Sequence, residues 1–166
     1  MRPIAGFAVL AIAITSCSLL KGHAAVQVGQ AFPQMTFTGL DGSADPLTFA
    51  PGRVTFVNVF ATWCPPCKAE TPDLAAFATR SADKGVDVIG IDQEETASAV
   101  RAFAQRYGIR YPLVISQGRE TKDVLGARII PRTIVVDGKG IIRAVISGPM
   151  TAAQMVQLAA AAGANS

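Results

Sequence analysis

The sequence predicts an α/β fold in which a mixed central β-sheet carries helices on both faces. Three observations support this prediction. Short apolar runs rich in β-branched residues, such as residues 54–60, alternate with stretches of helical periodicity. The turn sequence Asp137-Gly138-Lys139-Gly140 joins the last two runs as an antiparallel hairpin. A final helical stretch follows. The order βαβαβ, then a hairpin and a helix, fits such a two-faced sheet.

The expected elements follow one another along the chain with few residues between them. They are an edge strand within 28–37, a strand at 54–60, a helix at 66–80, a strand at 86–91, a helix at 96–107, a strand at 111–115, a short helix at 119–125, strands at 134–136 and 141–147, and a helix from 151.

Local signals justify the elements of the N-terminal half. Pro33 argues against a central position for the first strand, because proline cannot donate to a ladder. Pro51-Gly52 marks a turn just before the buried strand, and Asp41-Gly42-Ser43 marks another. Pro72 falls inside the first long helix, where we expect a kink. Lys84-Gly85 ends that helix.

Spacing and capping justify the elements of the C-terminal half. Val100, Phe103, Ala104 and Tyr107 recur at the spacing of one buried helix face, and Gly108 then ends that helix.

The last helix begins at Thr151, where Gln154 completes a capping box. Gly126 ends the short helix that precedes the final strands.

Composition limits the class of protein. The chain has 166 residues, of which 50% are hydrophobic, so one domain with a substantial core is expected. The formal net charge is +3, and no cluster of lysine and arginine interleaved with aromatic residues occurs. We therefore expect no nucleic-acid partner.

The N-terminus has the pattern of a secretion leader. Arg2 precedes an apolar run at 4–14, and Ile14-Thr15-Ser16-Cys17 resembles a bacterial lipobox. We expect cleavage before Cys17 and lipidation of this residue; cleavage near Gly22-His23-Ala24 and a retained anchor are the alternatives. In all three cases the domain is exported to a compartment where disulfides persist. The predicted division is a leader at 1–16, a tether at 17–27 and a domain at 28–166.

A Cys-x-x-Cys motif directly follows the central buried strand. Cys64 and Cys67 lie at the predicted start of a helix, with Pro65 and Pro66 between them in positions that suit a first turn. A thiol at a helix N-terminus lies near unpaired N–H groups and the positive end of the helix dipole, which favour the thiolate. We expect Cys64 to be the more exposed, attacking sulfur and Cys67 to be the resolving thiol.

Trp63-Cys64-Pro65-Pro66-Cys67 followed by Lys-Ala-Glu-Thr-Pro resembles the thioredoxin-like proteins of the bacterial cell envelope. The closest pattern is that of the TlpA/ResA/DsbE type, within the redoxin/AhpC-TSA-like superfamily. The resemblance spans residues 28–162. It implies a thioredoxin fold with an N-terminal strand extension, a redox disulfide between the two cysteines, and no cofactor.

The resemblance also implies roles for other residues. The Ile130-Pro131 bond is expected to be cis, beside the dithiol, with the Ile130 backbone pairing with a substrate segment. Glu70 is expected to tune the cysteine pKa values and transfer protons, although a solvated helix position is an equal alternative. Trp63 is expected to shield the disulfide, and Pro66 to stiffen the loop between the sulfurs.

Two positions depart from thioredoxin itself or from the family's common residue. Asn58 stands where thioredoxin has a buried acid, which leaves Glu70 as the candidate base. Arg132 replaces a frequent threonine and is expected to favour the thiolate as a neighbouring cation, to select an acidic partner, or simply to point to solvent.

The predicted function is an exported thiol–disulfide oxidoreductase that reduces specific envelope proteins, such as apocytochrome c or copper-site assembly proteins. Electrons would come from a membrane thiol transporter, and the membrane would be reached through the lipid or an N-terminal anchor. Oxidation in place of reduction is an alternative.

Other functions on the same fold fit the sequence less well. A peroxiredoxin-like peroxidase would need a threonine where Ala61 stands. A metal site or copper carrier would need further ligands, and the only histidine is His23.

Overall fold

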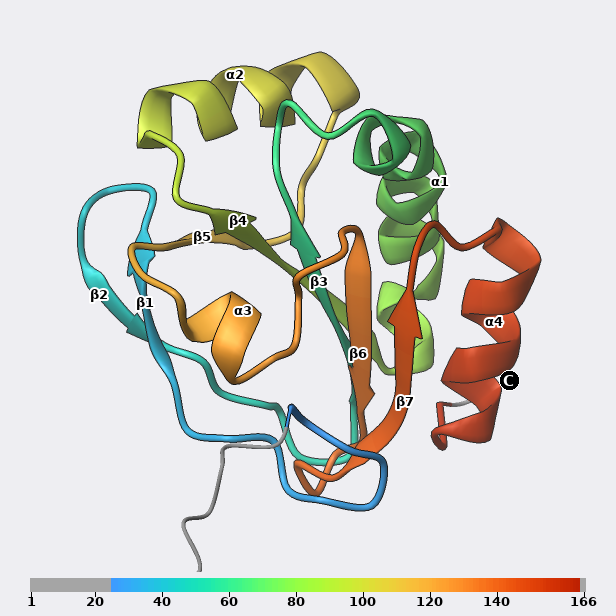
Figure 1. Cartoon of the computed structure of the whole chain (residues 1–166). Coiled ribbons are helices and arrows are strands. Elements are labelled where there is room, and N and C mark those ends of the chain that lie inside the picture. Colours follow the sequence, from blue (N-terminus) through green and yellow to red (C-terminus); the bar gives the residue numbers. More distant parts are fainter. Residues whose placement is uncertain (1–24, 165–166) are drawn as a thin grey trace, which may run out of the picture.

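The structure is a computed structural model, and it describes residues 25–164. Seven strands form one sheet and the helices pack on it (Figure 1). The elements are β1 (Thr36–Gly39), β2 (Ala44–Pro46), β3 (Val54–Phe60), α1 (Pro65–Ser81), a 3₁₀ turn η1 (Ala82–Lys84), β4 (Val86–Gln93), α2 (Ala97–Tyr107), β5 (Leu113–Ser116), α3 (Glu120–Asp123), β6 (Arg132–Val136), β7 (Ile142–Ser147) and α4 (Ala152–Ala161).

The sheet is mixed, as predicted, with the order β2-β1-β5-β4-β3-β6-β7. β3 pairs in parallel with β4 and antiparallel with β6, and all seven of its residues are buried. β4 and β5 are also parallel, whereas β1 and β7 run antiparallel to their neighbours. A strand that is covered on both faces has a nearly continuous apolar sequence, and this pattern is what predicted β3.

The two faces of the sheet have different covers. Phe56 of β3 packs in one cluster with Leu74 and Phe77 of α1 and Met155 of α4, and these two helices lie side by side in Figure 1. Helix α2 joins the same face, because the crossovers from β3 to β4 and from β4 to β5 proceed in one direction. The opposite face is covered by α3, the segment that follows it and residues from the N-terminal stretch, including the buried Val26.

The N-terminal strand differs from the prediction. β1 begins at Thr36 and lies between β2 and β5, so the edge strand is the unpredicted β2. The predicted turn at 41–43 explains this arrangement: Asp41 Oδ1 accepts from the Ser43 N–H at 2.9 Å, and the chain folds back so that β2 pairs with β1. Before Thr36 the described part of the chain forms no named strand, but an isolated bridge pairs Ala31 with Ile141, and backbone hydrogen bonds join Gly29 and Gln30 to Ile142 of β7.

The helix boundaries mostly follow the predicted capping signals. Thr151 and Gln154 form the capping box of α4, and Gly108 ends α2 with a φ of 64°. α1 continues through Pro72 to Ser81. The predicted helix at 119–125 is shorter, since only Glu120–Asp123 are helical.

Candidate active site

The cysteine pair sits at the carboxyl end of β3, where the chain enters α1. Cys64 is the N-cap residue of α1, and its sulfur accepts a hydrogen bond from the Cys67 N–H at 3.3 Å. Pro65 and Pro66 occupy the first two helical positions, where a missing N–H costs nothing. The two sulfurs are joined in a disulfide, with the Cα atoms 5.3 Å apart. The motif is therefore built as a helix-terminal redox pair.

The expected difference in exposure between the two cysteines is absent from this disulfide form. Cys64 and Cys67 are both 2% exposed. They pack in one cluster with Val100 and Phe103 of α2, and the partly buried Ile130 also covers this cluster. The burial of Cys64 comes from elements distant in sequence, which the motif alone does not reveal.

The segment before β6 completes the site. The Ile130-Pro131 peptide bond is cis, as the resemblance implies. The Ile130 carbonyl oxygen lies 3.8 Å from the Cys64 sulfur, and the Pro131 carbonyl is occupied by the Gly148 N–H at 2.8 Å. Among residues 25–164, the Ile130 N–H has no acceptor. One backbone donor beside the disulfide is thus open to another chain.

Two large apolar side chains are exposed at residues adjacent in sequence to Cys64 and Ile130. Trp63 precedes Cys64 and is 62% exposed, whereas Ile129 precedes Ile130 and is 69% exposed. Exposed apolar side chains of this size are typical of contact surfaces for other proteins. Trp63 is absent from the cluster that buries the disulfide, to which α2 and Ile130 contribute.

Glu70 is a buried acid one turn beyond Cys67. It is 4% exposed, so the alternative of a solvated helix position is wrong. Its Oε1 accepts from the Met150 N–H at 2.8 Å, and its Oε2 accepts from Asn58 Nδ2 at 3.3 Å. Burial raises the pKa of Glu70, and these two hydrogen bonds offset only part of that rise. A proton is held here more readily than on an exposed glutamate.

Asn58 orients this acid from the centre of the sheet. Its side-chain amide donates to Thr133 Oγ1 at 2.9 Å as well as to Glu70. The amide has no proton to exchange near neutral pH. Among the buried side chains of this corner, the titratable role therefore belongs to Glu70.

Arg132 does not extend freely into solvent, because its guanidinium is hydrogen-bonded within the fold. Its Nε donates to the Leu125 carbonyl at 2.7 Å, and its Nη1 donates to Ser147 Oγ at 2.7 Å. Neighbouring residues of a strand point to opposite faces of the sheet. The side chain of Thr133 faces Asn58, so that of Arg132 points to the other face, which α3 covers. The guanidinium ties β6 to neighbouring segments and makes no hydrogen bond to the dithiol.

Sequence reasoning missed an acidic pair beside the motif. Glu95 accepts from both the N–H and the Oγ1 of Thr62, two residues before Cys64. Asp92, at the end of β4, is fully buried beneath it. The position of this pair could have been inferred from the sequence. Both acids lie at or just after the end of β4, and the carboxyl ends of parallel strands such as β3 and β4 meet at one edge of the sheet.

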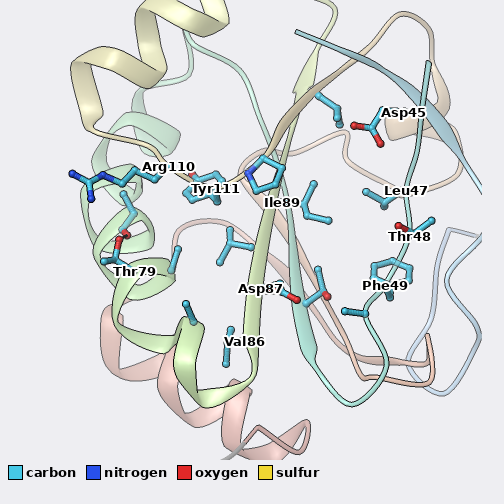
Figure 2. A pocket seen from close by; sticks show the side chains of 18 of the residues that line it. Asp45, Leu47, Thr48, Phe49, Thr79, Val86, Asp87, Ile89, Arg110 and Tyr111 are labelled. Atoms are coloured by element: carbon cyan, nitrogen blue, oxygen red, sulfur yellow. Dashed lines mark hydrogen bonds between the residues drawn. The ribbon is translucent and has the colours of Figure 1, made fainter. Parts of the chain in front are cut away.

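A separate hollow of about 670 Å³ lies away from the dithiol (Figure 2). Ile89 of β4 lies between Tyr111 on one side and Leu47 and Phe49 on the other. The hollow arises where β5 does not pair with the first half of β4, because their pairing begins only at Gly90. None of the predicted site residues lines it.

Other predicted features fall partly outside the described chain. Cys17 and the leader lie outside residues 25–164. Within that range, no three His, Cys, Asp or Glu side chains are grouped so that they could hold a metal ion. No helix of that part of the chain has the length and apolarity needed to cross a membrane.

Comparison with known proteins decides the family. A model of the Redoxin family matches residues 27–162. The chain belongs to the Redoxin family. Thiol-disulfide oxidoreductase ResA of Bacillus anthracis is 31% identical over 130 residues, which is 78% of this chain and 75% of that protein. ResA of Halalkalibacterium halodurans is 32% identical over 131 residues, or 79% and 74% of the two chains.

Solved structures agree with this Redoxin assignment. A thiol:disulfide interchange protein of Chlorobium tepidum superposes with a TM-score of 0.71 at 28% identity, covering 83% of this chain and 99% of that one. StoA of Bacillus subtilis shares the fold, with a TM-score of 0.64 at 22% identity over 76% and 96% of the chains. The thioredoxin-like fold is confirmed, and the chain is a thiol–disulfide oxidoreductase with its Cys-x-x-Cys pair at Cys64 and Cys67.

Proposed function

We propose that this oxidoreductase is exported and reduces disulfides of specific envelope proteins, with Cys64 attacking and Cys67 resolving. One observation carries the assignment of roles. The Cys64 sulfur lies at the N-terminus of a 17-residue helix, accepts the Cys67 N–H, and adjoins the open backbone of Ile130. The helix terminus favours its thiolate, and Ile130 offers a donor to an extended client segment.

The reaction transfers two electrons to the client. The Cys64 thiolate attacks one client sulfur, the client disulfide breaks, and its other sulfur leaves as a thiolate that takes a proton from solvent. The Cys67 thiol gives its proton to Glu70 and attacks the Cys64 sulfur. The second client sulfur leaves as a thiolate, receives that proton, and the Cys64–Cys67 disulfide remains. The burial that raises the pKa of Glu70 suits it to hold the proton between these steps.

The cellular setting rests on the N-terminal pattern. Lipidation at Cys17 would hold the domain at the membrane surface of the periplasm. Apocytochrome c or copper-site assembly proteins would be clients, and a membrane thiol transporter would return the electrons. Mass spectrometry of the mature N-terminus tests this part separately: a diacylglyceryl cysteine supports it, and an unmodified Met1 contradicts it.

A pair of trapping variants tests the roles of the cysteines. Cys67→Ser should accumulate mixed disulfides with client proteins, because no resolving thiol remains. Cys64→Ser should accumulate none. Equal trapping by the two variants would show that the roles are assigned wrongly. Equilibration with a glutathione buffer then tests whether the protein acts as a reductant or an oxidant. At a buffer potential at which an oxidant such as DsbA is reduced, the disulfide of a reductant stays oxidised.

A further inference from the structure

A carboxylate holds the segment that leads into Cys64. Glu95 Oε2 accepts from the Thr62 N–H at 2.5 Å, and Glu95 Oε1 accepts from Thr62 Oγ1 at 2.6 Å. Both oxygens of one side chain therefore fix one residue. Thr62 is separated from Cys64 only by the exposed Trp63, so this contact sets the path of the chain into the redox pair.

A second carboxyl group lies beneath the first. Asp92 pairs with Phe60 in the β3–β4 register and is 0% exposed. Its Oδ1 accepts from the Glu95 N–H at 3.0 Å. Its Oδ2 has no hydrogen-bond partner within residues 25–164. A buried carboxylate oxygen without a donor is costly, whereas the same oxygen carrying a proton becomes a donor.

We propose that Asp92 is a positioning residue for thiol–disulfide exchange: its protonated carboxyl group donates to Glu95 and thereby holds Glu95 on Thr62. The proton on Oδ2 joins two side chains that would otherwise repel each other. Through Glu95, it fixes the geometry of the Cys64 segment. This role concerns the exchange reaction itself and does not depend on export or on the identity of clients.

The electrostatics of the site agree with this arrangement. Burial, together with the side-chain hydrogen bond and negative charge of Glu95, raises the pKa of Asp92 from 3.8 to about 8, and the hydrogen bond from the Glu95 N–H opposes only part of this rise. Glu95 is the charged group whose proximity shifts this pKa; the neighbouring Glu94 is paired with Lys122 at 3.1 Å. The proton is retained below about pH 8 and lost above it. Its loss sets two carboxylates against each other and releases Thr62.

The rate at which dithiothreitol reduces the oxidised full-length chain tests the proposal. Asp92→Asn keeps the shape, the acceptor for the Glu95 N–H and a donor to its carboxylate, but it has no proton to lose. The two proteins should react at equal rates at about pH 6, and wild type should be about tenfold slower than Asp92→Asn at about pH 9.5. The ionisation of dithiothreitol changes with pH in the same way for both proteins, so it cancels in the ratio of their two rates.

Two further variants make the test decisive. Asp87→Asn changes the same residue type on the same strand, in an ion pair with Arg53, and should follow wild type at every pH. Glu95→Gln keeps only one acceptor for the two Thr62 donors and should react more slowly even at about pH 6. A constant ratio of wild type to Asp92→Asn across the pH range overturns the proposal. An unchanged rate in Glu95→Gln overturns the role of Glu95 on which the proposal depends.

Discussion

Replacing Asp92 with asparagine should change how the stability of the folded protein depends on pH. Burial and the neighbouring Glu95 raise the folded-state pKa of Asp92 to about 8, whereas the unfolded chain has the ordinary value of 3.8. Between these values the folded state binds one more proton than the unfolded state. The stability that this proton confers is fully present below the unfolded pKa, and it is lost as the pH rises through the folded pKa.

The size of the effect follows from the difference of one proton. The free energy of unfolding of wild type should fall by about 1.4 kcal/mol per pH unit within this window. Asp92→Asn lacks this slope while keeping the volume and hydrogen bonds of the site. From about pH 5 to about pH 7, the variant should therefore gain about 3 kcal/mol relative to wild type.

Urea unfolding of the two oxidised proteins at a series of pH values measures the difference directly. Equal m-values would show that the unfolding transitions expose the same surface. Asp87→Asn is the matched control, because its carboxylate is paired with Arg53 at a partly exposed position. It should show no such gain with rising pH. Parallel stability curves for wild type and Asp92→Asn would refute the reasoning, because the buried carboxyl group would then hold no extra proton.

Three other substitutions have distinct expected outcomes. Glu70→Gln should slow resolution of a mixed disulfide at least about tenfold, because burial raises the pKa of Glu70 and suits its carboxylate to take the Cys67 proton, which an amide cannot do. Resolution at the wild-type rate in a single-turnover assay would contradict this role. Trp63→Ala should leave the rate with dithiothreitol nearly unchanged but raise KM for protein substrates, because the side chain is 62% exposed; an unchanged KM would remove Trp63 from the contact surface. Phe77→Ala should cost about 3–5 kcal/mol in urea unfolding, whereas the exposed control Val156→Ala should change stability by about 0.5 kcal/mol or less, and equal losses would contradict the assigned core.

The sequence predicted those parts of the fold whose signals are local. β3 was predicted because a strand buried on both faces is a continuous apolar run, and α4 because Thr151 and Gln154 form a capping box. The position of β1 could not be predicted in the same way. Its neighbour β5 lies far along the chain, so its place inside the sheet depends on a long-range pairing.

The site divides similarly into local and distant contributions. The spacing of Cys64 and Cys67 predicted the redox pair, but the equal burial of the two cysteines depends on α2 and Ile130. The contacts of Arg132 depend on carbonyl and hydroxyl groups that no short motif contains. The pair of Asp92 and Glu95 becomes apparent only when β3 and β4 lie side by side.

Mapping of alkylated peptides tests the redox pair most directly. The full-length chain is treated with an alkylating reagent before reduction, after dithiothreitol, and after reoxidation with glutathione disulfide. Cys64 and Cys67 should be unmodified at first, both modified after reduction, and protected again after reoxidation. Modification that is the same under all three conditions would contradict a reversible dithiol as the centre of the activity.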